Sequence, residues 1–366
     1  MATANDPLVM QLIRFEFRHI YAIDQIAQTF SARVLAIFVI PSQVVMARGE
    51  ELCTGLKDED KPRFRSARWY ASMLRFNNMQ DGGGSNLPST NVVEAKDGSL
   101  EITLVAEGTF HDAFQLQRFP VDVQDLIVHV TCLCANEKSV PVRLEIPQNQ
   151  RQYKARVDME NFTLSNVWRL ENAVMVSDKS ILAKELGLSY PGIKFQTHVH
   201  RRAGYYYINV CAPLACLVLL ALCQFAIAPE DVADRLSVSL TLLLTAIAFK
   251  TATASLVPPI AYLTILDFYE LYMILIMVLS VVAAPVASLE GWQGIDHLAV
   301  IVLVSLWALA HLWFFLRLFC IKQTSNASRW AREREKVHDG QFLAHSLLRG
   351  QHPSAVRRVT MEPAGP

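Results

Sequence analysis

Hydrophobic and polar positions follow different patterns in two parts of the chain. Between residues 8 and 203, short runs rich in β-branched and aromatic residues are separated by turn-forming segments, and no long helical period is present. Short strands with turns at regular spacing favour an all-β, immunoglobulin-like sandwich. The expected strands are 9–20, 30–40, 100–106, 126–132, 140–146, 166–175 and 192–199.

From residue 205 to residue 321 the chain is almost continuously apolar. Four stretches are long enough to cross the ~30 Å hydrocarbon core of a bilayer as helices, because about 20 residues suffice. Short connections between the stretches predict a four-helix transmembrane bundle. The expected spans are 205–227, 236–257, 260–284 and 295–321. The chain is thereby divided into the parts 1–203, 204–321 and a basic C-terminal tail, 322–366.

The second apolar stretch differs from the others because one side of its helix is polar. An advance of ~100° per residue brings hydroxyl and small residues back to one face about every fourth position. Arg235 and Lys250 fall on the far side. Unpaired hydroxyls are costly in lipid, so the polar face needs either water or another helix. This face consists of Asp234, Ser237, Thr241, Leu244, Ala248, Thr251 and Ser255.

Two interpretations of the polar face are open. In the first, the hydroxyls bond back to carbonyls of their own helix and the face packs against a neighbouring helix. In the second, several copies surround a water-filled pore, in which Leu244 is an apolar gate and Asp234 forms a ring of negative charge that selects ions. One such helix cannot enclose a pore, so the second interpretation requires a rotationally symmetric oligomer.

Composition restricts the classes of function. Lys+Arg and Asp+Glu both number 34, and a formal net charge of zero argues against a nucleic-acid partner bound by bulk charge. Charged residues make up 19% of the chain, below the ~25% of soluble domains, which excludes a wholly soluble protein. The sequence shows no nucleophile–base pair and no metal-ligand spacing, so we expect no enzyme activity, no metal and no cofactor.

Residues 118–124, which lie between two expected strands, read Arg-Phe-Pro-Val-Asp-Val-Gln. This segment resembles the signature loop, Phe-Pro-Phe-Asp-x-Gln, of the pentameric ligand-gated ion channels, the Cys-loop receptor superfamily. The resemblance covers about residues 10–320, with the matching segments in the family's order. The other matching residues are 23–25 with 28–30, Trp69 with Asn77 and Asn78, 201–206 with Pro213, and Asp234 and Arg235 followed by Pro258, Tyr262, Thr264 and Asp267.

The resemblance implies an extracellular ligand-binding domain over 1–203, which binds a small-molecule agonist between subunits, and a pore domain over 204–321. It also implies a homopentamer in the plasma membrane that passes inorganic ions across the lipid bilayer. The family's anion channels have no acid before the arginine at position 235, so Asp234 favours cations. The alternatives are a non-conducting, membrane-tethered binding protein on the same fold and an auxiliary subunit of a heteromeric receptor.

The resemblance also implies a coupling mechanism. Asp122 and Arg201 are similar to the pair that ties the signature loop to the strand before the membrane. Phe119 and Pro120 would press on the loop around Pro258, so that agonist binding shifts an equilibrium between closed and open states.

The sequence departs from the animal members of the family in two places. The cysteines that flank the signature loop would fall at Asp112 and Leu126, as in prokaryotic members, which lack them. Phe76 and Tyr190 are the only aromatic residues that we assign to the agonist site, too few for the cage that holds a quaternary amine.

Protons are the alternative agonist, because imidazole titrates near neutrality. Of the ten histidines, His198 and His200 come directly before Arg201. We expect these two to be ordinary exposed strand residues.

Overall fold

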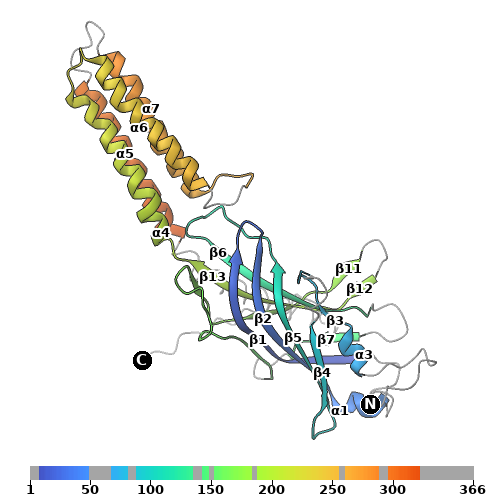
Figure 1. Cartoon of the computed structure of the whole chain (residues 1–366). Coiled ribbons are helices and arrows are strands. Elements are labelled where there is room, and N and C mark those ends of the chain that lie inside the picture. Colours follow the sequence, from blue (N-terminus) through green and yellow to red (C-terminus); the bar gives the residue numbers. More distant parts are fainter. Residues whose placement is uncertain are drawn as a thin grey trace, which may run out of the picture. The chain divides into compact units, whose positions relative to one another are not determined.

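The computed structural model describes residues 8–48, 67–80, 88–134, 142–147, 152–183, 188–254, 260–287 and 296–321 (Figure 1). A β-rich part is followed by four long apolar helices, which confirms the predicted fold class. Ser255 and Pro258 lie outside the described residues.

The first sheet has six strands in the order β4-β5-β2-β1-β7, with β8 also paired to β1. β1 and β2 form its centre, as a long antiparallel hairpin. The hairpin turn is stabilised by Asp24, whose Oδ1 accepts the backbone N–H groups of Ile26 and Ala27. The strands are β1 (Leu8–Asp24), β2 (Thr29–Ile40), β4 (Ser89–Glu94), β5 (Leu100–His111), β7 (Val142–Glu145) and β8 (Lys154–Val157).

The second sheet has the order β10-β13-β6-β3, with β9 also paired to β13. Strand β6 alternates part-exposed and buried residues over most of its length, which places one face of the sheet against the first sheet. Phe15 of β1 and Phe195 of β13 stack across this core, with ring centroids 3.7 Å apart. The strands are β3 (Leu74–Phe76), β6 (Val123–Cys132), β9 (Trp168–Leu170), β10 (Met175–Asp178) and β13 (Gly192–Arg201).

Smaller elements complete the β-rich part. A separate two-stranded ribbon contains β11 (Ile181–Ala183) and β12 (Leu188–Tyr190). Two short helices, α1 (Ser42–Arg48) and α3 (Ala67–Ser72), follow β2 and precede β3.

The first membrane helix runs over Gly204–Ala226 and changes its hydrogen-bonding pattern along its length. It contains α4 (Gly204–Tyr206), a π-helical turn (Tyr207–Cys211), α5 (Ala212–Leu222) and a 3₁₀ turn (Cys223–Ala226). Pro213, which has no backbone N–H to donate, lies just after the π-helical turn, where such an irregularity is expected.

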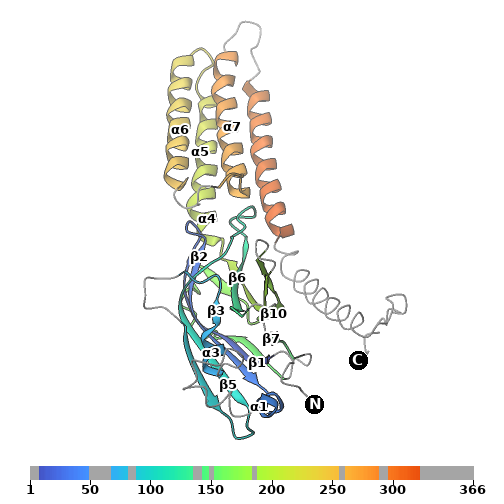
Figure 2. The ribbon, with the colours of Figure 1, turned by 90° about the vertical axis from the view of Figure 1, so that its right-hand side faces the viewer.

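The remaining membrane helices are α6 (Val232–Thr253), α7 (Ile265–Ala287) and the fourth apolar helix, Asp296–Ile321. α5, α6 and α7 pack side by side (Figure 2). The predicted start of α7, residue 260, was wrong because Thr264 and Asp267 form a capping box. Asp267 Oδ2 accepts the Thr264 N–H at 2.8 Å, and Thr264 Oγ1 accepts the Asp267 N–H at 3.1 Å.

Buried polar contacts hold the helices together. Gln224 Nε2 donates to the carbonyl oxygen of Ser280 at 2.7 Å. The Tyr269 hydroxyl donates to the Cys211 carbonyl oxygen at 3.2 Å and lies 3.0 Å from His311 Nε2. Contacts of this kind fix the register of membrane helices, because no hydrophobic force acts between helices in lipid.

Candidate functional site

The predicted pore-lining face of α6 is the face that the helix turns away from the rest of the chain. Arg235, Ser239 and Ala246 are buried and mark the side that packs on the other helices. On the opposite side, Leu244 is 68% exposed. The described members of the predicted face are all exposed: Asp234, Ser237, Thr241, Leu244, Ala248 and Thr251.

The threonine hydroxyls on α6 donate to carbonyl oxygens one turn earlier. Thr241 Oγ1 lies 2.7 Å from the Ser237 oxygen, and Thr251 Oγ1 lies 3.0 Å from the Ile247 oxygen. This is the bonding of the first interpretation, yet the exposed oxygens keep lone pairs that point away from the helix. A hydroxyl whose hydrogen is already used can accept from water or contact a cation, but it cannot donate to an anion.

Negative charge gathers where α6 begins. Glu230, Asp231 and Asp234 are exposed, whereas the neighbouring Arg235 is buried. A helix N-terminus favours nearby acids, because its free N–H groups carry partial positive charge. The exposed surface at this end of the helix is therefore anionic.

A second cluster of predicted residues lies in the connection between β5 and β6, residues 112–122, which includes most of the segment that resembles the family's signature loop. From here on, this whole connection is called the signature loop. Arg201 Nε donates to Asp122 Oδ1 at 2.6 Å, and Arg201 Nη2 donates to Asp122 Oδ2 at 2.9 Å. Both side chains are buried, and Gln124 Nε2 adds a bond to Asp122 Oδ2. This two-point ion pair fixes the signature loop to the end of β13.

The same guanidinium lies between aromatic rings. Its central carbon is 4.1 Å from the ring centroid of Trp168 and 4.9 Å from that of Phe119. Phe119 in turn meets the ring of Tyr206, in the first membrane helix, with centroids 4.6 Å apart. The sequence did not predict the contact with Trp168, because Trp168 and Arg201 are distant in the chain and come together only through the pairing of β9 with β13.

The signature loop also reaches the segment between α6 and α7. The backbone N–H of Leu116 donates to the Tyr262 hydroxyl oxygen at 3.1 Å. Pro120 is buried and follows Phe119 through a cis peptide bond. The predicted contact with Pro258 lies outside the described residues, and Tyr262 supplies the contact that the structure describes.

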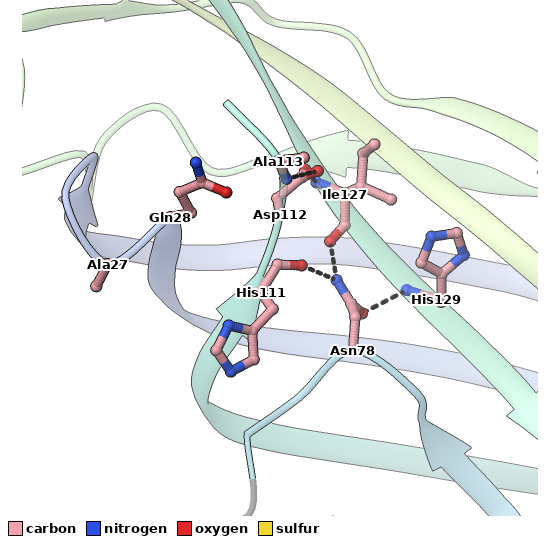
Figure 3. Close-up of a pocket in the computed structure, with 8 residues that line it drawn as sticks. All are labelled: Ala27, Gln28, Asn78, His111, Asp112, Ala113, Ile127 and His129. Carbon is pink, nitrogen blue, oxygen red and sulfur yellow. Dashed lines mark hydrogen bonds between the residues drawn. The ribbon is translucent and has the colours of Figure 1, made fainter. Parts of the chain in front are cut away.

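The neck of the signature loop, where β5 ends and β6 begins, is closed by hydrogen bonds from two side chains (Figure 3). Asp112 Oδ2 accepts the N–H of Ile127 at 3.0 Å, next to the position where the family's second cysteine would fall. Asn78 Nδ2 donates to the carbonyl oxygens of His111 and Ile127, and Asn78 Oδ1 accepts the N–H of His129. The neck is thus held in place without a covalent bond.

Asp112 borders a cavity of about 380 Å³, which is also lined by Gln28, Asn78, His111 and His129. Burial raises the pKa of the Asp112 carboxyl to about 6, against the opposing effect of the N–H groups of Ile127 and Ala113. Burial lowers the pKa of His129 to about 4, so this imidazole is neutral at pH 7. The carboxyl group of Asp112 therefore titrates close to neutrality.

The two histidines before Arg201 are less exposed than predicted. His198 is 2% exposed, and its Nδ1 lies 2.6 Å from Asp125 Oδ1 on the neighbouring strand β6. His200 Nε2 lies 3.4 Å from Glu171 Oε2, and burial lowers the pKa of His200. The prediction of exposed strand histidines was wrong because the residues that precede β10 cover this end of β13. There the backbone N–H of Glu171 donates to the His198 carbonyl oxygen.

The predicted agonist residues differ in burial. Phe76 packs in the sandwich core, with its ring centroid 6.0 Å from that of Phe110. Tyr190, at the end of β12, is part-exposed. Their role in agonist binding stays a prediction.

No family model matches the chain. Similar proteins are the acetylcholine receptor subunit alpha-type acr-7 of Caenorhabditis elegans, 24% identical over 52% of this chain, and the acetylcholine receptor subunit delta of Xenopus laevis, 24% identical over 61%. The glutamate-gated chloride channel subunit beta of Haemonchus contortus is 24% identical over 42%. The matches cover 35%, 43% and 34% of these relatives, so the chain spans less than half of their length. All three names describe receptor or channel subunits, not enzymes.

We expect Asp122→Asn to lower the free energy of unfolding by about 3–5 kcal/mol, because it leaves the buried Arg201 without a counter-charge. The double variant with Arg201→Gln should lose less than the sum of the single losses. Chemical unfolding of the detergent-solubilised protein, followed by tryptophan fluorescence, measures both quantities. Arg33→Gln, at an exposed ion pair with Glu107, is the control and should cost under about 1 kcal/mol. Strict additivity would contradict the prediction.

We expect Asp112 to make the protein more stable as the pH falls. The pKa of this carboxyl is about 6 in the folded chain and near 3.8 ordinarily, so its contribution to stability is complete below pH 4 and is lost as the pH rises through 6. Between pH 7 and pH 5 the gain should be about 1 kcal/mol relative to Asp112→Asn. Parallel unfolding curves of the two proteins at both pH values test this, and an unchanged difference would show that Asp112 does not titrate in this range.

Proposed function

We propose that the chain, a homologue of subunits of the Cys-loop superfamily of pentameric ligand-gated ion channels, forms a homopentameric channel that is opened by an agonist and passes cations. In this proposal the chain is a multi-pass integral membrane protein, and its N-terminal domain is extracellular. In this proposal residues 1–203 bind agonist, residues 204–321 form the pore and residues 322–366 are a basic tail.

The observation that carries the proposal is the polar, exposed face of α6. Hydroxyls and a carboxylate project from a helix long and apolar enough to span a bilayer, on the side that the other helices leave uncovered. Lipid gives such a face no partner, whereas five copies around an axis supply it with water. Leu244, in the middle of this face, then becomes a ring of apolar side chains that closes the pore by excluding water.

Two features of the face support cations. Thr241 and Thr251 have already donated their hydroxyl hydrogens, so they offer oxygen lone pairs to the lumen. Asp234, with Glu230 and Asp231 close by, would place a ring of carboxylates at the end of the pore where α6 begins. The relatives include subunits of both acetylcholine receptors and a chloride channel, so the choice of ion rests on these side chains.

Coupling between the two domains would run through the signature loop. The Asp122–Arg201 pair anchors this loop to β13, and Leu116 connects it to Tyr262 in the segment that follows α6. A small-molecule agonist or a proton that binds the open arrangement more tightly would open the channel through these contacts.

An auxiliary subunit that needs a partner is the second candidate. The burial of Phe76 in the sandwich core favours it, because it leaves fewer exposed rings to hold an agonist. Such a subunit would bind within a heteromeric receptor and conduct no ions alone.

We expect the purified chain, reconstituted alone in a planar bilayer, to give discrete cation currents when pH, small amines and small acids are screened as agonists. Leu244→Ser should raise the current without agonist, because a hydroxyl at the gate holds water. Silence of both proteins under every condition would reject the homomeric channel and favour the auxiliary subunit.

We expect Asp234→Ala to reduce the preference for cations over anions, because it removes one carboxylate per subunit from the pore entrance. Reversal potentials under a KCl gradient measure the preference. Asp158→Ala, at a part-exposed carboxylate of the β-rich domain, is the control and should leave the reversal potential unchanged. An equal reversal potential in Asp234→Ala and the wild type would refute the assignment.

A further inference from the structure

Arg235 is a fully buried cation at the start of α6, with 0% of its side chain exposed. Its Nη1 donates to Asp296 Oδ1 at 2.9 Å and its Nη2 donates to Asp296 Oδ2 at 2.7 Å. Its Nε donates to the carbonyl oxygen of Ile227 at 3.0 Å. The planar guanidinium is therefore held on two sides, by a carboxylate and by a backbone oxygen.

The partner of this cation belongs to another membrane helix. Asp296 is the first residue of the fourth apolar helix, and it is mostly buried against Arg235. The free N–H groups of a helix start stabilise a carboxylate there. The carboxylate of Asp296 thus lies both at the start of its own helix and beside the guanidinium of Arg235.

The consequence concerns the neighbour of Arg235. Asp234 is exposed on the proposed pore face, about 100° around the helix from Arg235. Removal of Asp296 would leave the guanidinium only the Ile227 carbonyl oxygen, and an arginine side chain is long and flexible enough to reach toward water around the helix. Without Asp296, the guanidinium would bring one positive charge per subunit to the mouth that Asp234 makes negative.

We propose that Asp296 is a positioning residue for ion selectivity: it holds Arg235 buried and neutralised, so that only carboxylates face the permeating ion. This inference rests on the proposed channel function. It gives the fourth helix, which is remote from the polar face of α6, a part in the choice of ion. The effect is electrostatic, so it should be larger at low ionic strength, where screening lengths grow.

The experiment is a charge cycle on the pair, read by reversal potentials of the reconstituted full chain under a KCl gradient. Asp296→Asn should lower the ratio of cation to anion permeability several-fold, because it leaves Arg235 unneutralised. Arg235→Gln should keep the wild-type ratio or raise it. The double variant Arg235→Gln/Asp296→Asn, whose pair is again neutral, should return close to the wild-type ratio.

Two controls separate electrostatics from packing. Ser280→Ala removes a buried, uncharged hydroxyl that accepts from Gln224 Nε2, and it should leave the ratio unchanged. Asp296→Glu retains the charge and should keep the ratio near that of the wild type, even where it lowers the thermal midpoint. These two variants show that loss of packing alone does not move the reversal potential.

The outcomes are distinct for the two proposals. A silent wild-type protein rejects the channel function itself. Two results with a conducting wild type overturn the role of Asp296. In the first, Asp296→Asn has the same ratio of cation to anion permeability as the wild type. In the second, the double variant shows the same shift in this ratio as Asp296→Asn. If Asp296→Asn fails to assemble, Asp296→Ala takes its place: a lowered ratio that Arg235→Gln restores supports the proposal, and a ratio equal to that of the wild type contradicts it.

Discussion

A polar group inside an apolar helix needs a partner, because hydrocarbon supplies neither donors nor acceptors. Arg235 meets this constraint through Asp296 and the Ile227 carbonyl, and Gln224 meets it through Ser280. The threonine hydroxyls of α6 satisfy their donor hydrogens through carbonyl oxygens of their own helix, and their acceptor lone pairs remain open. On α6 an exposed polar face with carboxylates at its start remains, and this face points to water.

The β-rich domain meets the same constraint by a different route. The buried charges Asp122 and Arg201 lie where the chain turns toward the membrane, and both are held by directional contacts. Arg201 combines an ion pair with Asp122 and two aromatic rings, which leaves the guanidinium little freedom to rotate. A rigid junction of this kind moves as a unit. Its contacts with Tyr206 and Tyr262 connect that movement to the first membrane helix and to the segment after α6.

The sequence was sufficient to predict the two-part fold, because strand alternation and span length are local patterns. It also indicated which side of α6 is polar, since helical periodicity depends only on spacing. The partner of Arg235 was not predictable in the same way, because Asp296 is distant in the chain and packing alone brings it close. Arg235 is the only base in the links 228–235 and 285–296, however, which could have prompted a search for its acid. The capping box at Thr264 was a readable signal for the start of α7, and it was overlooked.

The neck of the signature loop has a consequence for how the protein is made. Asp112 and Asn78 close the loop with hydrogen bonds to backbone groups. Closure of this kind needs no oxidant, and it forms and breaks reversibly as the chain folds. The loop is accordingly indifferent to thiol reductants and needs no disulfide isomerase. A host cell with a reducing cytosol can fold this neck as readily as an oxidising secretory compartment can.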